Sequence, residues 1–304
     1  MSTGKLTILA TPKAFRGHIG VIQWNAITSW RKLVPRPDVF LFGEEEGAAE
    51  TASELGIGHL RDVAPTEFGT PRLDDLLRGA REVARTPLLA FVNSDIILLQ
   101  EFLDAVGSVA DKLPQFLIVA HRLNIELHRS LDFSAGWQNA LRRDVMLQGK
   151  PGDHTAIDVF VFSAELYTDA PALALGRAWF DQWMIKAARQ RGVPVVDITR
   201  VARAIHQNHD YGHIADGQRG AYWGEEALQN LEMYGGAPHA FTLLEATHDL
   251  QPDGELRRVR FRREKYLARE WVWRNLVERT ASLRSRFGLR RETLRRIMGK
   301  RTAR

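Results

Sequence analysis

Along the first third of the chain, short apolar runs alternate with segments whose apolar residues recur at helical spacing. The runs predict buried strands at Lys5–Ala10, Val39–Phe42, His59–Val63 and Leu88–Asn93. The periodic segments predict helices over residues 19–33, 46–55 and 71–85, the last with a proline in its first turn. Strands that alternate with helices form βαβ units, so we expect an α/β fold with a doubly wound, mostly parallel sheet. Ligands of such sheets lie beyond the carboxyl ends of the strands.

The second half of the chain has a less regular pattern. Strands are predicted at Phe116–Ala120, Asp158–Phe162 and Pro194–Ile198, and helices at Trp137–Leu147 and Trp179–Arg191. Long polar segments lie between these elements, and a further one begins at His206. Loops of this length in a compact domain usually carry function, so we expect site residues from this half as well.

Composition limits the chemistry that the chain can perform. The 304 residues contain no cysteine, which excludes disulfides, thiol nucleophiles and cysteine-ligated zinc. A bound metal would rest on carboxylate, imidazole or carbonyl ligands, which favours Mg²⁺ or Mn²⁺. No apolar run approaches the roughly 18 residues needed to cross a bilayer, and the run Leu6–Ala10 is too short for a signal sequence. We therefore expect a cytoplasmic protein.

The net charge of +5 is unevenly distributed. From Glu255 onward there are 18 Lys and Arg against 5 Asp and Glu, which leaves 24 against 32 for the rest of the chain. We therefore expect a body at residues 1–250, with a nucleotide-binding half at 1–115 and an acceptor half at 116–250, and a basic helical tail at 251–304. Basic residues beside aromatic ones predict amphipathic helices on an anionic membrane surface, at the inner face of the membrane.

Two other interpretations of the tail stay open. It could be a solvated helix docked on the body, or it could contact nucleic acid or an acidic glycan. The mildly acidic body argues against a protein that wraps nucleic acid over its whole surface.

Asn93-Ser94-Asp95 closes the apolar run Leu88–Val92 at the point where a buried strand must reach the surface. A carboxylate at this place can hold a divalent metal against a phosphate. The alternative is that Asp95 only ends the strand and caps the segment that follows.

With the strands laid out, the chain resembles the nucleotide-sugar glycosyltransferases of the GT-A fold, in particular bacterial family-2-like members. The resemblance covers roughly residues 5–245 and is carried by Phe15-Arg16-Gly17-His18, Asn93-Ser94-Asp95-Ile96-Ile97 and His206-Gln207-Asn208-His209-Asp210-Tyr211. Members place an Asp-x-Asp motif, or a shortened variant, at the end of a central strand, and Asn93 stands where the first Asp would be. The resemblance implies that Asp95 holds Mn²⁺ or Mg²⁺.

GT-A enzymes often bring a C-terminal histidine to the metal, so the resemblance also makes His206 and His209 candidate metal ligands. The alternatives are that one of them packs against Tyr211 or binds phosphate directly, or that both are ordinary loop residues.

Transfer with inversion needs a carboxylate that deprotonates the acceptor hydroxyl. Asp181 is the first candidate, because the resemblance implies a catalytic acid at the start of an aromatic-flanked helix. Its alternative role is to complement the helix dipole. Asp158 is the second candidate, because an acid that opens a buried strand must be paired or used.

The resemblance implies that the loops after the first two strands hold the base, ribose and phosphates of the donor. The candidates at the donor end are Thr11, Lys13, Arg16, Glu45, Arg72, Asn93 and Ser94. Each of them alone could equally be a solvated surface residue.

The sequence therefore predicts a metal-dependent, inverting, hexosyltransferase-like enzyme. We expect it to move a sugar from a nucleotide diphosphate sugar to a surface-glycan or lipid-linked acceptor. One rival is a catalytically inactive GT-A-like protein that binds sugar nucleotide or glycan. The other is a nucleotidyltransferase, although Thr11–Gly17 lacks the Gly-rich, Lys- or Arg-containing loop of that class.

Overall fold

The structure is a computed structural model that describes residues 6–209, 217–236 and 239–271. The chain divides into two compact units, residues 1–260 and residues 261–304. In the second unit, residues 262–271 are helical. The rest of the predicted basic tail, residues 272–304, lies outside the described residues, and so does the prediction of amphipathic helices there. None of the described helices is long and apolar enough to cross a membrane.

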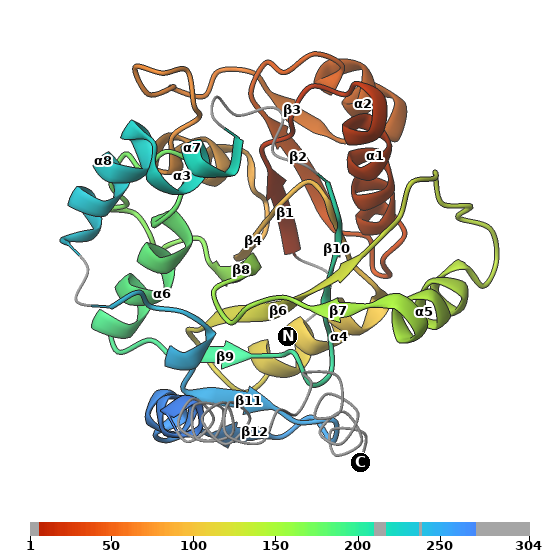
Figure 1. The fold of residues 1–304 in the computed structure, drawn as a ribbon. Helices are drawn as coiled ribbons and strands as arrows, with labels where there is room; N and C mark the ends of the chain where they lie inside the picture. Colours follow the sequence, from red (N-terminus) through yellow and green to blue (C-terminus); the bar gives the residue numbers. More distant parts are fainter. Residues whose placement is uncertain (1–5, 210–216, 237–238, 272–304) are drawn as a thin grey trace, which may run out of the picture. The chain divides into compact units, whose positions relative to one another are not determined.

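The first unit is built on one mixed sheet, seen in Figure 1, with the strand order β12-β11-β9-β6-β8-β4-β1-β2-β3. The bounds are β1 Leu6–Ala10, β2 Asp38–Phe42, β3 Gly58–Leu60, β4 Leu88–Val92, β6 Leu117–Ile125, β8 Ile157–Ser163, β9 Val195–Asp197, β11 His248–Leu250 and β12 Leu256–Arg258. Strands β3, β2, β1 and β4 are parallel neighbours, and so are β6, β9 and β11. Strand β8 runs antiparallel between β4 and β6 and joins the two parallel groups. The predicted α/β fold with a mostly parallel sheet is confirmed.

Three short strands extend the sheet beside the ends of β4 and β6. They are β5 Ile96–Ile97, β7 Lys150–Pro151 and β10 Ala204–Gln207. Strand β10 pairs in parallel with β6 and antiparallel with β5, while β7 pairs with β6. These pairings bring residues that follow β4 next to residues near position 206.

Helices cover both faces of the sheet because successive residues of a strand point to opposite sides. On one face, α1 Gly17–Arg31, α2 Ala48–Leu55 and α4 Gln100–Ala110 bury a cluster that includes Leu6, Ile8 and Ala10 of β1. On the other, α3 Leu73–Val83 and α6 Phe180–Gln190 bury a cluster that includes Leu9 of the same strand. A third, smaller cluster lies between α5 Trp137–Gln148 and strands β5 and β10.

Several elements were not predicted from the sequence. Helix α4 follows the apolar segment at residues 96–99 with no glycine or proline between them, so no local signal separates the two. Helices α7 Gly217–Trp223 and α8 Glu225–Tyr234 and the short η1 Leu243–Glu245 lie in the polar segment after β10. Strands β11 and β12 pair with each other, so Leu256–Arg258, which was predicted as part of the tail, belongs to the sheet of the first unit.

Candidate active site

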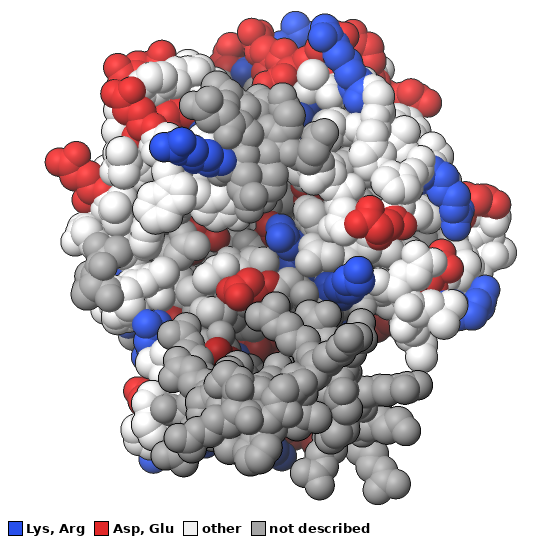
Figure 2. Space-filling view, viewed as in Figure 1, with Lys and Arg blue, Asp and Glu red and all other residues white. Residues whose placement is uncertain are grey.

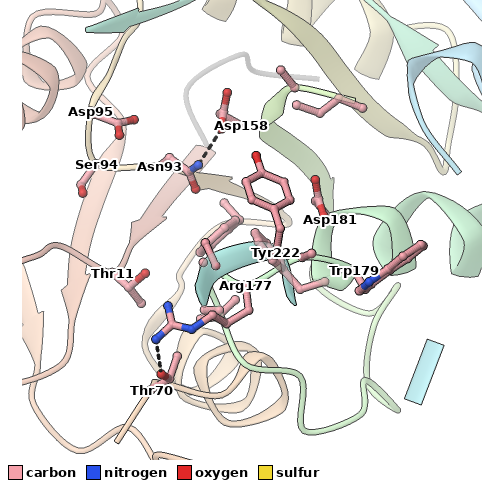
Figure 3. A pocket seen from close by; sticks show the side chains of 18 of the residues that line it. Thr11, Thr70, Asn93, Ser94, Asp95, Asp158, Arg177, Trp179, Asp181 and Tyr222 are labelled. Atoms are coloured by element: carbon pink, nitrogen blue, oxygen red, sulfur yellow. Dashed lines mark hydrogen bonds between the residues drawn. The ribbon is translucent and has the colours of Figure 1, made fainter. Parts of the chain in front are cut away.

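A cavity of about 650 Å³ opens where β1, β2 and β4 end and antiparallel β8 begins (Figure 3). Its lining on the β1, β2 and β4 side includes Thr11, Lys13, Glu45, Asn93, Ser94 and Asp95. On the other side it includes Arg122, Asp153, Asp158, Arg177, Trp179, Asp181 and Tyr222, and His206 and His209 also line it. The cavity therefore lies at the predicted edge of the sheet.

Asp95 lies at this edge with two histidines close to its carboxylate. Strand pairing explains the arrangement, because Ile96 of β5 is the register partner of His206 in β10. The Nε2 atom of His206 is 3.7 Å from Oδ2 of Asp95, and Nε2 of His209 is 3.0 Å from the same oxygen. One possible ligand atom from each of the three residues lies within 4.8 Å of those of the other two. The three side chains form a group that could hold a metal ion.

Unpartnered buried atoms in this group fit a cation. Among the described residues, Oδ1 of Asp95 and Nδ1 of His206 are buried and accept or donate no hydrogen bond. A buried polar atom without a partner is costly unless a ligand satisfies it. In a chain without cysteine, two imidazoles and a carboxylate suit Mn²⁺ better than Mg²⁺, which prefers oxygen ligands. The residues present therefore fit the metal that the sequence predicts.

The protonation states in this group also suit metal binding. Burial opposes the ionisation of Asp95, yet its two imidazole neighbours hold the pKa of its carboxyl well below the usual range. Lys13 adds to this lowering. Burial lowers the pKa of His206, so its imidazole is neutral near neutral pH and keeps a lone pair. An ionised carboxylate and a neutral imidazole are the forms that ligate metals.

A ladder of buried side-chain amides fixes the loop that carries Asp95. Gln23 of α1 accepts from the backbone N–H of Lys13 at 2.6 Å and from Oγ of Ser94 at 2.9 Å. Gln207 of β10 donates to the backbone carbonyl of Asp95 at 3.0 Å and accepts from Asn25 of α1 at 2.9 Å. Both glutamines are almost fully buried. They tie the ends of β1, β4 and β10 to one helix, and sequence reasoning did not find them.

Asn93 is committed to a neighbouring carboxylate rather than to the metal-ligand group. Its Nδ2 donates to Oδ1 of Asp158 at 2.7 Å, and its backbone N–H donates to the carbonyl of the same residue (Figure 3). The guanidinium of Arg122 lies 3.5 Å from the other carboxylate oxygen. Burial raises the pKa of Asp158, although the Arg122 guanidinium favours ionisation. The hydrogen bonds from Asn93 therefore set the orientation of the Asp158 carboxyl group.

Asp181 lies in the first turn of α6 and lines the cavity. Backbone N–H groups at the start of the helix favour its ionised form, but burial and the nearby Asp158 outweigh them. Burial raises the pKa of Asp181 to about 7. A carboxyl with this pKa can take up a proton near neutral pH. In Figure 3, the ring of Tyr222 points toward the two carboxylates of Asp158 and Asp181.

Backbone strain occurs two residues before this acid. Trp179, which caps α6, has a φ of 83°, in the left-handed region that favours glycine. The side chain of Gln182 accepts from its backbone N–H at 2.8 Å, and its ring packs against Tyr234 at 5.2 Å between centroids. Non-glycine residues held in this conformation cluster at functional sites. The strain therefore marks the start of α6 as part of the site.

The predicted donor residues separate into two groups. Thr11, Lys13, Glu45, Asn93 and Ser94 line the cavity.

Arg16 and Arg72 do not line the cavity. Arg16 pairs with Glu46 and lines a second hollow of about 460 Å³, and its side chain is 73% exposed. Arg72 pairs with Asp74 at 2.5 Å at the start of α3. Each arginine therefore pairs with a nearby carboxylate and does not line the cavity.

Arg177 lines the cavity and was not predicted. Its Nε donates to Glu226 of α8 at 2.7 Å, and its Nη2 donates to the hydroxyl of Thr70 at 3.0 Å (Figure 3). Glu226 also accepts from the hydroxyls of Thr66 and Thr70. In the sequence, Arg177 follows Gly176 shortly before the aromatic-flanked helix, and this position does not indicate which side chains Arg177 contacts.

Comparison with known proteins gives similarity of fold. No protein-family model matches the chain, and no curated protein matches it. Glucosyl-3-phosphoglycerate synthase from Mycobacterium tuberculosis, in complex with Mn²⁺, UDP and phosphoglyceric acid, is 17% identical, with a TM-score of 0.46 over 78% of this chain and 80% of the synthase. S. aureus TarS in complex with UDP-GlcNAc is 12% identical, with a TM-score of 0.40 over 67% of this chain and 56% of TarS. The expected resemblance to GT-A glycosyltransferases is confirmed as a likeness of fold.

The two histidines are expected to differ in their effect on the metal. Both histidine side chains are buried, but His206 is fixed in β10 whereas His209 follows the strand, so His206→Ala should lower Mn²⁺ affinity by at least about 10–100-fold and His209→Ala by less. Isothermal titration with MnCl₂ in the presence of UDP measures both affinities. Equal and negligible losses in the two variants would exclude both histidines as metal ligands.

Proposed function

We propose that this protein is a metal-dependent glycosyltransferase that uses a nucleotide diphosphate sugar. One observation carries the proposal. The same cavity holds the group Asp95, His206 and His209, which fits a divalent metal, and Asp181, whose pKa is raised to about 7. A metal site for a diphosphate and a carboxyl poised as a base are the two chemical requirements of sugar transfer from a nucleotide.

The donor is proposed to lie on the side formed by β1, β2 and β4. Asp95 with His206 and His209 would hold Mn²⁺ or Mg²⁺, which when bound neutralises the charge that develops on the leaving diphosphate. Lys13 lies close enough to Asp95 to favour its ionisation, so it also places positive charge beside the diphosphate. Thr11 and Glu45 come from neighbouring strand ends and offer hydroxyl and carboxylate groups to the nucleoside.

The proposed transfer is a single displacement with inversion at the anomeric carbon. The acceptor hydroxyl oxygen forms a bond to that carbon, the bond from the carbon to the diphosphate oxygen breaks, and the nucleoside diphosphate leaves. The proton of the acceptor hydroxyl passes to the carboxylate of Asp181. Asp158 adds a second acid close by, and Asn93 holds it in place. The acceptor is proposed to be a surface-glycan or lipid-linked molecule.

A second candidate is a protein that binds sugar nucleotide or glycan without transfer. Asn93 favours it, because this residue stands at the first acid of the motif and gives its amide to Asp158 instead. Release of free sugar from UDP- or GDP-sugars in the presence of Mn²⁺ separates the two. Turnover supports the transferase, and binding without turnover supports the inactive protein.

The proposed function is tested by thermal denaturation with nucleoside diphosphates and metal. We expect one nucleoside diphosphate, UDP or GDP, to raise the melting temperature together with Mn²⁺, and to do so much less in EDTA. A ligand at about 100 times its dissociation constant stabilises the native state by about 2.7 kcal/mol. The absence of any metal-dependent shift with UDP, GDP, ADP or CDP would contradict the proposal.

A further inference from the structure

Three aromatic side chains of the cavity lining are open to solvent. Phe68 is 49% exposed, Tyr222 is 45% exposed and Trp223 is 70% exposed. Phe68 belongs to the loop between β3 and α3, and the other two end α7. Exposed large aromatics gathered at a cavity mark a surface that a ligand covers. We call these three residues the aromatic rim.

A buried carboxylate fixes the aromatic rim in place. Glu226 lies in the first turn of α8, three residues after Trp223, and is 6% exposed. It accepts from Thr66 at 2.6 Å and from Thr70 at 2.8 Å, the two threonines that flank Phe68 in its loop. The same carboxylate therefore anchors both segments that carry the rim. A surface that is held in shape before the ligand arrives loses less entropy on binding.

The charges beside the aromatic rim do not suit an anionic ligand. Among the described lining residues on this side of the cavity, Arg122 of β6 is paired with Asp158 of β8, and Arg177, before α6, is paired with Glu226. Asp153 and Asp181 add acidic groups to the same lining. On the face seen in Figure 2, acidic and basic side chains are interspersed. A carboxylate or phosphate here would meet neutralised arginines and further acids, which disfavours it.

We propose that the acceptor of this enzyme is a neutral carbohydrate whose ring packs on the aromatic rim. This inference rests on the proposed function and names the acceptor class of the same site. A sugar ring is apolar on its C–H face and carries hydroxyls at its edge. The C–H face packs on the rings of Phe68 and Trp223. The hydroxyls donate to the carboxylates of the cavity, among them Asp181, the proposed base.

The test probes an array of neutral and acidic oligosaccharides with the full-length chain, with and without UDP and Mn²⁺. We expect binding to neutral members, and we expect Trp223→Ala and Phe68→Ala each to weaken it about tenfold. Met146→Ala serves as the matched control, because Met146 is 86% exposed on α5 and lies outside the cavity lining. Melting curves verify that all three variants fold.

Three results overturn the inference. They are binding confined to sialylated, sulfated or phosphorylated members, wild-type binding by both aromatic variants, and binding to no member of the array. Calorimetry of the wild-type protein with UDP or GDP and Mn²⁺ tests the proposed function separately. A protein that binds nucleotide but no neutral glycan loses the acceptor inference alone, and one that binds glycan but no nucleotide loses the proposed function.

Discussion

Replacing Asp95 with asparagine is expected to abolish metal-dependent binding of nucleoside diphosphate. The amide keeps the shape of the side chain but removes the negative charge next to His206 and His209. Loss of an outer-shell partner of a ligand typically costs 10–100-fold in metal affinity, so loss of the only acid in the group should cost more than about 100-fold. Isothermal titration of the variant with UDP or GDP, in MnCl₂ and in EDTA, measures the effect.

The control for this substitution is Asp153→Asn. Asp153 also lines the cavity, but its side chain is 65% exposed and it lies outside the metal-ligand group. The control should retain wild-type dependence on Mn²⁺, which separates loss of a ligand from loss of general negative charge. If Asp95→Asn binds nucleotide with the same Mn²⁺ dependence as the control, the assignment of Asp95 to the metal is wrong.

The strands and helices of the first half were predictable because their signals are local. Apolar runs of five residues and periodic segments gave the positions of β1, β2, β4 and α1 to within about two residues. The antiparallel direction of β8 has no such signal, since a fully buried strand reads the same in both directions. Its neighbours β4 and β6 fix that direction, and their paired residues lie about 70 and about 40 positions away in the chain.

Chemistry at strand ends was also predictable, whereas the contacts that hold it were not. Asp95 was found because a carboxylate directly after a buried strand must face the ligand edge of the sheet. Gln23 and Gln207 were missed, since a glutamine in a helix or strand shows nothing until its partner is known. Ser94 lies 71 residues from Gln23, and Asn25 lies 182 residues from Gln207.

The arginines show the same limit of prediction from sequence. Arg16 and Arg72 follow loops at the correct strand ends, but each pairs with an acid close to it on the surface. Arg177 reaches the cavity because Glu226, on a helix 49 residues later, turns its guanidinium toward Thr70. Side-chain direction depends on such partners, so position along the chain did not distinguish the three.

The shortened motif has a structural explanation in the contact between Asn93 and Asp158. The amide nitrogen of Asn93 donates to the carboxylate at 2.7 Å. An aspartate at position 93 would bring two carboxylates to this distance, and like charges so close cannot both ionise. Asn93 therefore lets Asp158 stay oriented at the cavity without that repulsion.

Replacing Asp181 with asparagine is expected to remove sugar transfer while donor binding persists. The amide preserves the shape of the side chain and removes its basicity. A general base contributes about 10²–10⁴-fold to a rate, so transfer should fall by that factor. Transfer is measured with a radiolabelled nucleotide sugar and an acceptor found on the oligosaccharide array, and nucleotide affinity is measured by calorimetry. Transfer within a few-fold of wild type would exclude Asp181 as the base and direct attention to Asp158.

The pH dependence distinguishes a base from a residue that only shapes the site. The base is the ionised form, so kcat/KM of the wild-type protein should rise with pH through the raised pKa of about 7 and level off above it.

The same shift predicts an effect on stability. The folded state holds the Asp181 proton at a pH where the unfolded chain, with its ordinary carboxyl, has released it, so stability falls as pH rises toward 7. The Asp181→Asn variant lacks this proton. The difference between its melting temperature and that of the wild type should therefore shift in favour of the variant as pH increases from about 5 to about 8 in metal-free buffer. A constant difference between the two proteins over that range would show that the pKa of Asp181 is not raised.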